Sequence, residues 1–135
     1  MAGYSDTPLS KKLGIKAGAR VKVSGAPDHF GDLVAPLPSN AVVSARLRPP
    51  VDILHLFSSS RLKLESELKR GIREIWPDGA IWVSWPKKAS GINTDVTEDV
   101  VRELALPMKL VDVKVCAVDD TWSGLKLVVR KSERR

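Results

Sequence analysis

The side chains best suited to binding chemistry gather in one loop, residues 85–91, with the sequence WPKKASG. The loop follows an apolar run and precedes a segment with helical spacing. In an open parallel sheet, ligands bind outside the carboxyl ends of the strands, and the first turn of a helix offers unpaired N–H groups to an anion. The sequence therefore predicts a site for a small anionic ligand. Its candidate residues are Lys87, Lys88, Ser90, Thr94 and Trp85, together with Gly25, which ends an earlier strand.

A plainer interpretation of the loop stays open beside the first. Two adjacent lysines are commonly solvated, and a tryptophan after an apolar strand commonly packs on the core. The loop also lacks the glycine-rich pattern of a P-loop. Trp122, in the sequence WSG at 122–124, has two interpretations as well. It is either a contact for a protein partner or a side chain that packs over the sheet edge.

The remaining reactive side chains form no complete catalytic or metal-binding motif. His29 and His55 stand at no spacing that links them to a nucleophile, and Cys116 lies within an apolar strand, where a buried thiol is the common case. Asp119 and Asp120 are either a cation-binding pair or a solvated hairpin link. No group of His, Cys, Asp and Glu has the spacing of metal ligands. We therefore expect no metal and no cofactor, and we assign no catalytic residue.

Size and composition favour one soluble domain. The chain has 135 residues, of which 43% are hydrophobic, and its single cysteine forms no internal disulfide. Residues 1–12 contain no apolar segment typical of a secretion signal, and the most apolar run, 51–57, is too short to cross a bilayer. We expect a cytoplasmic protein without a membrane partner, and its oligomeric state stays open.

The net charge of +6 lies at the two ends of the chain. Residues 1–22 and 126–135 are strongly basic, whereas the segment between them carries a small net negative charge. This distribution disfavours nucleic-acid binding by the domain as a whole. No aromatic side chain alternates with the lysines of the tail as a base-stacking platform would. We therefore do not expect a nucleic-acid partner.

The elements that must position the loop alternate between strands and helices. Val51–Phe57 is apolar on both faces, as in a buried parallel strand. The link between the last two strands is too short for a parallel crossover, so these strands form an antiparallel hairpin. The helix between residues 61 and 75 carries an apolar stripe at helical spacing. The predicted strands are 19–25, 41–47, 51–57, 80–85, 111–118 and 125–130, and Asp95 is the predicted N-cap of a second long helix.

This order predicts a single α/β domain over residues 1–135. It is a small three-layer Rossmann-like fold with a mostly parallel sheet and a C-terminal antiparallel hairpin. One conflict stays open, because residues 48–50 are too few for a parallel crossover. Strand 41–47 is therefore either antiparallel to strand 51–57 or not beside it. Residues 76–79, with the sequence WPDG, are typical of a type I turn.

Two tryptophan-bearing stretches carry a resemblance to a known family. Residues 82–91 (WVSWPKKASG) and 114–126 (KVCAVDDTWSGLK) resemble the bacterial family named domain of unknown function 3052. Residues 7–9 (TPL) and 11–15 (KKLGI) are similar to the start of that family, so the resemblance covers nearly the whole chain. It implies a small cytosolic bacterial protein and no particular activity.

A more distant resemblance is to class I S-adenosylmethionine methyltransferases. Residues 13–21 resemble their approach to the first strand, strand 51–57 and residues 78–81 (DGAI) resemble their fourth and fifth strands, and the closing hairpin resembles their reversed last strand. The chain departs from them after residue 23, where Gly25 begins a Gly-Ala-Pro loop in place of a Gly-x-Gly loop. Strand 41–47 also lacks the acidic residue that would bind ribose. The resemblance therefore implies a shortened methyltransferase-like sheet that has lost cofactor binding.

Three functions follow from these observations. The leading hypothesis is a non-catalytic ligand-binding or regulatory module, whose partner is a small anionic ligand or a protein. The alternative is an enzyme that binds a nucleotide or S-adenosylmethionine. The third is a weak nucleic-acid binder that acts through its basic termini.

Overall fold

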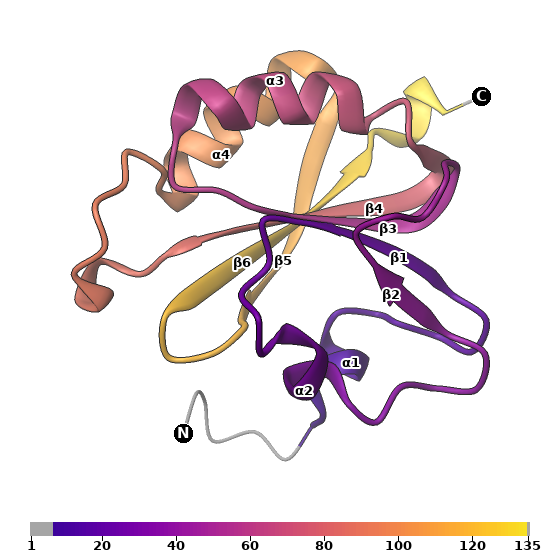
Figure 1. Ribbon diagram of the computed structural model, residues 1–135. Coiled ribbons are helices and arrows are strands. Elements are labelled where there is room, and N and C mark those ends of the chain that lie inside the picture. The colour runs from indigo at the N-terminus through magenta and orange to yellow at the C-terminus, as the bar shows by residue number, and fades with distance from the viewer. Residues whose placement is uncertain (1–6, 135) are drawn as a thin grey trace.

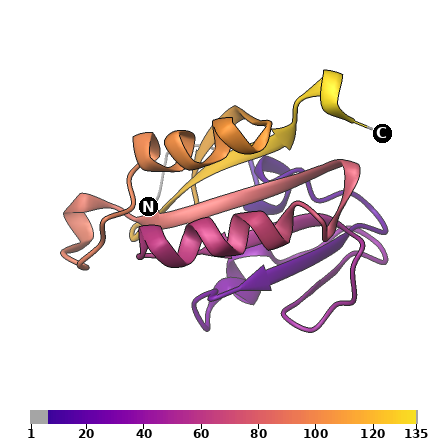
Figure 2. The ribbon, with the colours of Figure 1, turned by 90° about the horizontal axis from the view of Figure 1, so that it is seen from above.

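The protein is built on one six-stranded sheet with helices on both faces (Figures 1 and 2). The computed structural model describes residues 7–134. The strands are β1 (Arg20–Ser24), β2 (Val42–Ser44), β3 (Val51–Phe57), β4 (Ile75–Pro86), β5 (Leu110–Ala117) and β6 (Trp122–Val129). The helices are α1 (Leu9–Lys12), α2 (Phe30–Val34), α3 (Arg61–Gly71) and α4 (Glu98–Ala105), with short 3₁₀ turns η1 (Lys88–Ser90), η2 (Leu106–Met108) and η3 (Lys131–Glu133).

The strand order is β2-β1-β3-β4-β6-β5, and it confirms the predicted fold class. The first four strands in this order are parallel to one another. Strand β6 is antiparallel to both of its neighbours, β4 and β5, so it is the reversed strand of the C-terminal hairpin. The hairpin therefore inserts its second strand beside β4 and leaves β5 at the edge.

The structure resolves the conflict over the second strand. β2 pairs in parallel with β1 and does not pair with β3. Of the two alternatives, the one in which this strand does not lie beside strand 51–57 is therefore confirmed. Only Val42–Ser44 pair, and they lie opposite Arg20–Lys22, the first part of β1. Because β2 is this short, residues 45–50 suffice to bring the chain back to the start of β3 without a helix.

Strand β4 begins earlier than the apolar pattern indicates. The predicted type I turn at residues 76–79 lies inside β4, where the pairing with β3 is irregular between Val51 and Ile53. A side chain at Gly79 would meet the carbonyl oxygen of Asp52 at 2.9 Å, so glycine permits this close approach. The turn-forming residues thus produce an irregularity within a strand and not a chain reversal.

One apolar core lies between the sheet and the helices α3 and α4. It forms because both helices place an apolar stripe against the strands. Leu64 and Leu68 are fully buried on α3, and burial of each contributes about 1.5–3 kcal/mol to stability. On α4, the buried side chains Val101 and Leu104 belong to the same core. It also contains Ile81, Val83, Leu125 and Leu127 of the sheet.

The N-termini of α3 and α4 are held by polar side chains. Ser60 accepts a hydrogen bond from the backbone N–H of Lys63, as its position predicts for an N-cap. The cap of α4 is Thr97 and not Asp95. The Asp95 carboxylate instead accepts a hydrogen bond of 2.6 Å from the backbone N–H of Arg61. Asp95 therefore ties the segment before α4 to the start of α3.

The opposite core, under α1 and α2, contains an aromatic cluster. His55 is fully buried and stacks on Phe57 with 4.3 Å between ring centroids. Its Nε2 atom lies 2.7 Å from the Ser84 hydroxyl, and its Nδ1 atom has no hydrogen-bond partner among the described residues. The indole N–H of Trp82 donates to the carbonyl of Leu13, which fastens the chain after α1 to the sheet.

Residues 7–134 contain neither a membrane-spanning helix nor a cluster of metal ligands. No helix there is long and apolar enough to cross a membrane. In that same part of the chain, no three His, Cys, Asp or Glu side chains gather as the ligands of a metal ion would.

A pair of glycine substitutions tests the contact between β1 and β3. Gly25 and Gly18 both have a positive φ, at 71° and 74°, so alanine at either costs about 1–2 kcal/mol of backbone strain. Alanine at Gly25 also meets the carbonyl oxygen of Phe57 at 2.7 Å, whereas the space around Gly18 is open. We expect Gly25→Ala to reduce the unfolding free energy by at least 1 kcal/mol more than Gly18→Ala in urea titrations. Equal losses would contradict the close contact.

Buried His55 makes stability depend on pH. Burial lowers the pKa of His55 to about 3 from an ordinary value of 6.5. Because the folded pKa is the lower one, the stabilisation is fully present above pH 6.5 and is lost as the pH falls toward 3, at up to ~1.4 kcal/mol per pH unit. We expect His55→Gln to flatten this loss in urea titrations between pH 7 and 4.

The control for this substitution is His29→Gln, because the His29 side chain is 54% exposed. It should keep the steep acid loss of the parent protein. If the His55 variant does not fold, nitrogen NMR of the parent serves instead, and a His55 ring that gains a proton at pH 5 in the folded state contradicts the prediction.

Candidate functional site

A crevice is expected where the chain leaves β1 and β3 on opposite faces of the sheet. From β1 the chain passes to α2 on one face, and from β3 it passes to α3 on the other (Figure 1). The two strands are adjacent and parallel. In open α/β sheets such a reversal of strand order leaves a binding crevice outside the carboxyl ends. Gly25 and Ser58 follow directly after the two strands and flank this point.

Gly25, predicted as a site residue, lies at this point of the sheet, and its contacts are explained by packing. Its φ is 71°, and a Cβ atom there would lie 2.7 Å from the Phe57 carbonyl oxygen. The space that a glycine opens for a ligand in a cofactor loop is here filled by the backbone of β3. Beyond β2, residues 45 and 46 are Ala and Arg, so no acidic side chain stands there for a ribose.

The predicted loop follows β4, and its first lysine is held by the hairpin link. The backbone N–H of Lys87 donates to the carbonyl of Thr121, and its ammonium group donates to the carbonyl of Asp119, both at 2.7 Å. Ser90 closes the turn η1 through a hydrogen bond from its hydroxyl to the Lys87 carbonyl. The Lys88 side chain is exposed, and its ammonium group has no hydrogen-bond or ion-pair partner among residues 7–134. Of the two lysines, Lys88 is thus the one available to an anion.

The other predicted side chains also have structural partners. Trp85 is buried in the core under α3 and α4. The Thr94 hydroxyl donates to the carbonyl of Ser59 at 2.9 Å, so it joins the loop to the end of β3. Trp122 packs edge-on against Phe57 with 5.2 Å between ring centroids, and part of its surface stays exposed. Their roles in ligand or partner binding stay predictions.

Sequence reasoning missed a pair that spans the carboxyl edge of the sheet. The Nε2 atom of His29, next to α2, lies 2.9 Å from a carboxylate oxygen of Asp119 in the hairpin link. The other carboxylate oxygen accepts the backbone N–H groups of Thr121 and Trp122. The two residues are 90 positions apart, so no local spacing reveals the pair.

The electrostatics of Asp119 reflect these contacts. Burial acts to raise the pKa of this carboxyl, but the hydrogen bonds from His29 and from the two backbone N–H groups outweigh it, and the net pKa lies below the ordinary value. A carboxylate that orients an imidazole is one half of a general-base arrangement. Among the described residues no serine or cysteine side chain bonds to His29, so the pair is incomplete as a catalytic unit.

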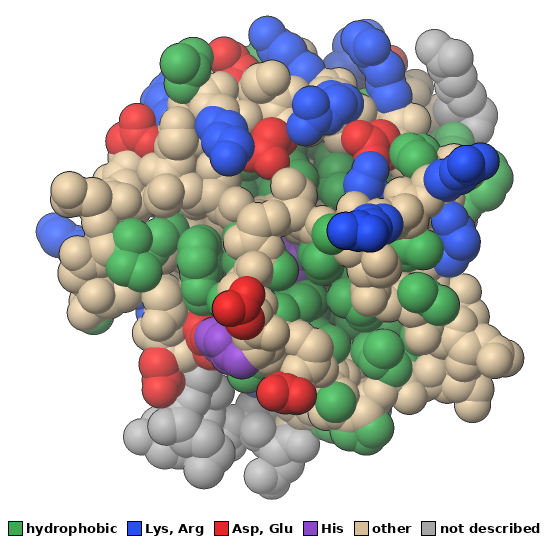
Figure 3. All heavy atoms as spheres, viewed as in Figure 1, with side chains coloured by type: hydrophobic (Ala, Val, Ile, Leu, Met, Phe, Trp, Pro, Cys, Tyr) green, Lys and Arg blue, Asp and Glu red, His purple; other side chains and the backbone are tan. Residues whose placement is uncertain are grey.

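The surface around this edge has mixed charge. Figure 3 shows a hollow lined by hydrophobic side chains, with acidic and histidine side chains gathered below it and Lys and Arg side chains gathered above and to the right. Acidic side chains also lie among the Lys and Arg side chains in the upper part of this view, so the charges are not separated into two sides. Figure 3 gives no sign of a uniformly basic face on this side of the molecule.

No family model matches the sequence, and no curated protein matches it, so the resemblance to domain of unknown function 3052 stays a prediction. The fold, in contrast, is similar to many solved structures. One is a SAM-dependent methyltransferase from Aquifex aeolicus, 16% identical, with a TM-score of 0.58 over 90% of this chain and 88% of that one.

Two further structures illustrate the range of this similarity. The fibrillarin pre-rRNA processing protein of Methanococcus jannaschii is 12% identical, with a TM-score of 0.64 over 96% of this chain and 71% of that one. A protein of the NADB-Rossmann superfamily from Streptococcus agalactiae is 12% identical, with a TM-score of 0.57 over the same shares, 96% and 71%. At these identities the similarity shows the fold alone. The chain has the fold of class I SAM-dependent methyltransferases.

Proposed function

We propose that this protein binds a nucleotide or S-adenosylmethionine at the carboxyl edge of its sheet. The observation that carries the proposal is the reversal of strand order between β1 and β3, because open α/β sheets bind their ligands outside the carboxyl ends of the strands at such a point. The similarity to SAM-dependent methyltransferases and to an NADB-Rossmann protein supports the same edge.

The side chains at this edge fit a phosphate better than the ribose and methionine of S-adenosylmethionine. No acidic side chain follows β2, and the glycine after β1 is closed in by the Phe57 carbonyl. Arg46 follows β2 instead, and an arginine near this position suits a phosphate on the ribose. Lys88 adds an exposed cation after β4. We therefore favour a phosphorylated nucleotide and derive no methyl-transfer step.

A second candidate function is binding without chemistry, as a regulatory or protein-interaction module. The polar contacts of the edge support it, because Lys87, Thr94 and the His29–Asp119 pair all bond to other parts of the chain. Groups used in this way hold the loops in place and are not free to take part in a reaction. The two candidates differ in whether a bound nucleotide is turned over.

Calorimetric titration with ATP, adenosine and S-adenosylmethionine tests the proposal. We expect ATP to bind and adenosine to bind more weakly, because the free cations contact phosphate. Lys88→Ala should weaken ATP binding by about three- to tenfold, the effect of one exposed charged contact. Lys69→Ala is the matched control, since Lys69 is an equally exposed lysine on α3.

The result that contradicts the proposal is the absence of heat from all three compounds at millimolar concentration. If Lys88→Ala and Lys69→Ala change the affinity for ATP equally, the loop after β4 is not part of the binding site. Incubation of the ATP complex, followed by chromatography of the nucleotide, separates an enzyme from a module that only binds.

A further inference from the structure

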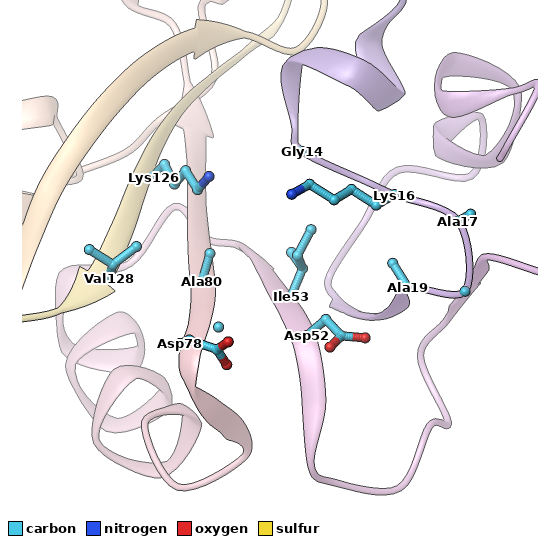
Figure 4. Close-up of a pocket in the computed structure, with 12 residues that line it drawn as sticks. Gly14, Lys16, Ala17, Ala19, Asp52, Ile53, Asp78, Ala80, Lys126 and Val128 are labelled. Atoms are coloured by element: carbon cyan, nitrogen blue, oxygen red, sulfur yellow. The ribbon is translucent and has the colours of Figure 1, made fainter. Parts of the chain in front are cut away.

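A pocket lies on the face of the sheet that carries α1 and α2, away from the carboxyl edge. It is an open pocket of about 430 Å³, within the size range of ligand sites. The loop after α1, the first part of β3, the irregular part of β4 and strand β6 form its walls (Figure 4). Its polar side chains are Lys16, Lys126, Asp52 and Asp78.

Lys126 of β6 lies on the face of the sheet that carries α1 and α2. It pairs with Trp82 of β4, and paired residues of antiparallel strands project to the same face. Trp82 is fully buried in the core on that face. A lysine beside it sends its ammonium group over the sheet and into the pocket, as Figure 4 shows.

The ammonium group of Lys126 has no counter-charge in the described part of the chain. No hydrogen bond or ion pair joins it to any residue among 7–134. Burial lowers its pKa, and the neighbouring charges of Lys114 and Lys16 lower it further. No carboxylate among residues 7–134 forms an ion pair with Lys126, Lys114 or Lys16, so the folded protein keeps a half-buried cation near like charges, an arrangement that favours an anionic ligand.

Lys16 completes the arrangement from the opposite wall. Its ammonium group points across the pocket toward that of Lys126 (Figure 4). Gly14, with a φ of 79°, lies over the same end, and a Cβ atom there would lie 3.6 Å from the Lys126 nitrogen. The small residue leaves room beside the two cations. An anion between them would satisfy both.

The far end of the pocket has the opposite character. Asp52 and Asp78 lie there, apart from the two lysine nitrogens (Figure 4). One oxygen of Asp52 accepts the backbone N–H of Arg20, which holds the carboxylate in place. Carboxylates are acceptors for hydroxyl groups. A ligand that fills the pocket therefore carries an anion at one end and hydroxyl groups at the other.

We propose that this pocket binds a small hydroxylated phosphomonoester, with the phosphate between Lys16 and Lys126 and the hydroxyl groups toward Asp52 and Asp78. The site is separate from the carboxyl edge and does not depend on the function proposed there.

Titration with inorganic phosphate and with glycerol 3-phosphate tests this site. At constant ionic strength, both should raise the thermal unfolding midpoint relative to chloride, and glycerol 3-phosphate should bind more tightly because its hydroxyl groups reach the carboxylates. Lys126→Met should weaken binding about tenfold or more. The same variant should unfold at an equal or higher temperature than the parent without ligand, because it removes an unpaired cation.

The control is Lys63→Met, an exposed lysine on α3 outside the pocket, which should bind as the parent does. Lys16→Met, exposed and so harmless to folding, should repeat the loss if Lys126→Met fails to fold. Amide NMR shifts on binding should centre on Gly14, Gly18 and Ala80. The proposal is overturned if neither compound binds, if both lysine variants bind as the parent does, or if the shifts centre on residues 87–91.

Discussion

The parallel pairing of β1 with β3 is the constraint on which the rest of the structure depends. These strands are neighbours in the sheet, although β2 separates them in the chain. Because the chain leaves them toward opposite faces, α2 covers one face, together with α1, and α3 covers the other, together with α4. Gly25 permits the close contact at their ends, where the Phe57 carbonyl fills the space that a side chain would need. The layers and the two cores follow from this pairing.

Many polar side chains at the carboxyl edge fasten the loops that surround it. Lys87 and Asp119 join the β4 loop to the hairpin link, and His29 joins α2 to the same link. Thr94 and Asp95 join the segment before α4 to the start of α3. The cations that have no partner at this edge are the ones available to bind an anionic ligand.

The basic charge at the two ends of the chain has a structural counterpart on one face of the sheet. Lys16, from the loop after α1, and Lys126, from β6, belong to the two basic segments and meet in one pocket. They meet because Trp82 fastens the chain after α1 to the middle of the sheet, next to β6. In the sequence, the basic charge suggests two solvated tails. In the folded domain, one lysine from each basic segment lines the same pocket.

The elements with strong local patterns were predictable. The bounds of β3 agree with the apolar run 51–57, because a strand buried on both faces leaves an uninterrupted apolar signature. The reversed hairpin was predictable from the short link between its strands. The prediction of a type I turn at residues 76–79 was wrong, because pairing with β3 outweighed the local preference of proline and glycine for a turn. The prediction that Asp95 caps α4 was wrong, because its carboxylate accepts a hydrogen bond from the backbone N–H of Arg61 at the start of α3.

The sequence by itself thus determined the fold class, the hairpin and the loop that follows β4. Only the tertiary structure decided which polar side chains are free. Lys87 and Lys88 are adjacent and chemically identical, yet the ammonium group of Lys87 donates to a carbonyl 32 positions away and that of Lys88 has no partner in residues 7–134. The meeting of Lys16 with Lys126, and of His29 with Asp119, likewise depends on strand order. Contacts between distant segments leave no local pattern, because their geometry exists only once the sheet has formed.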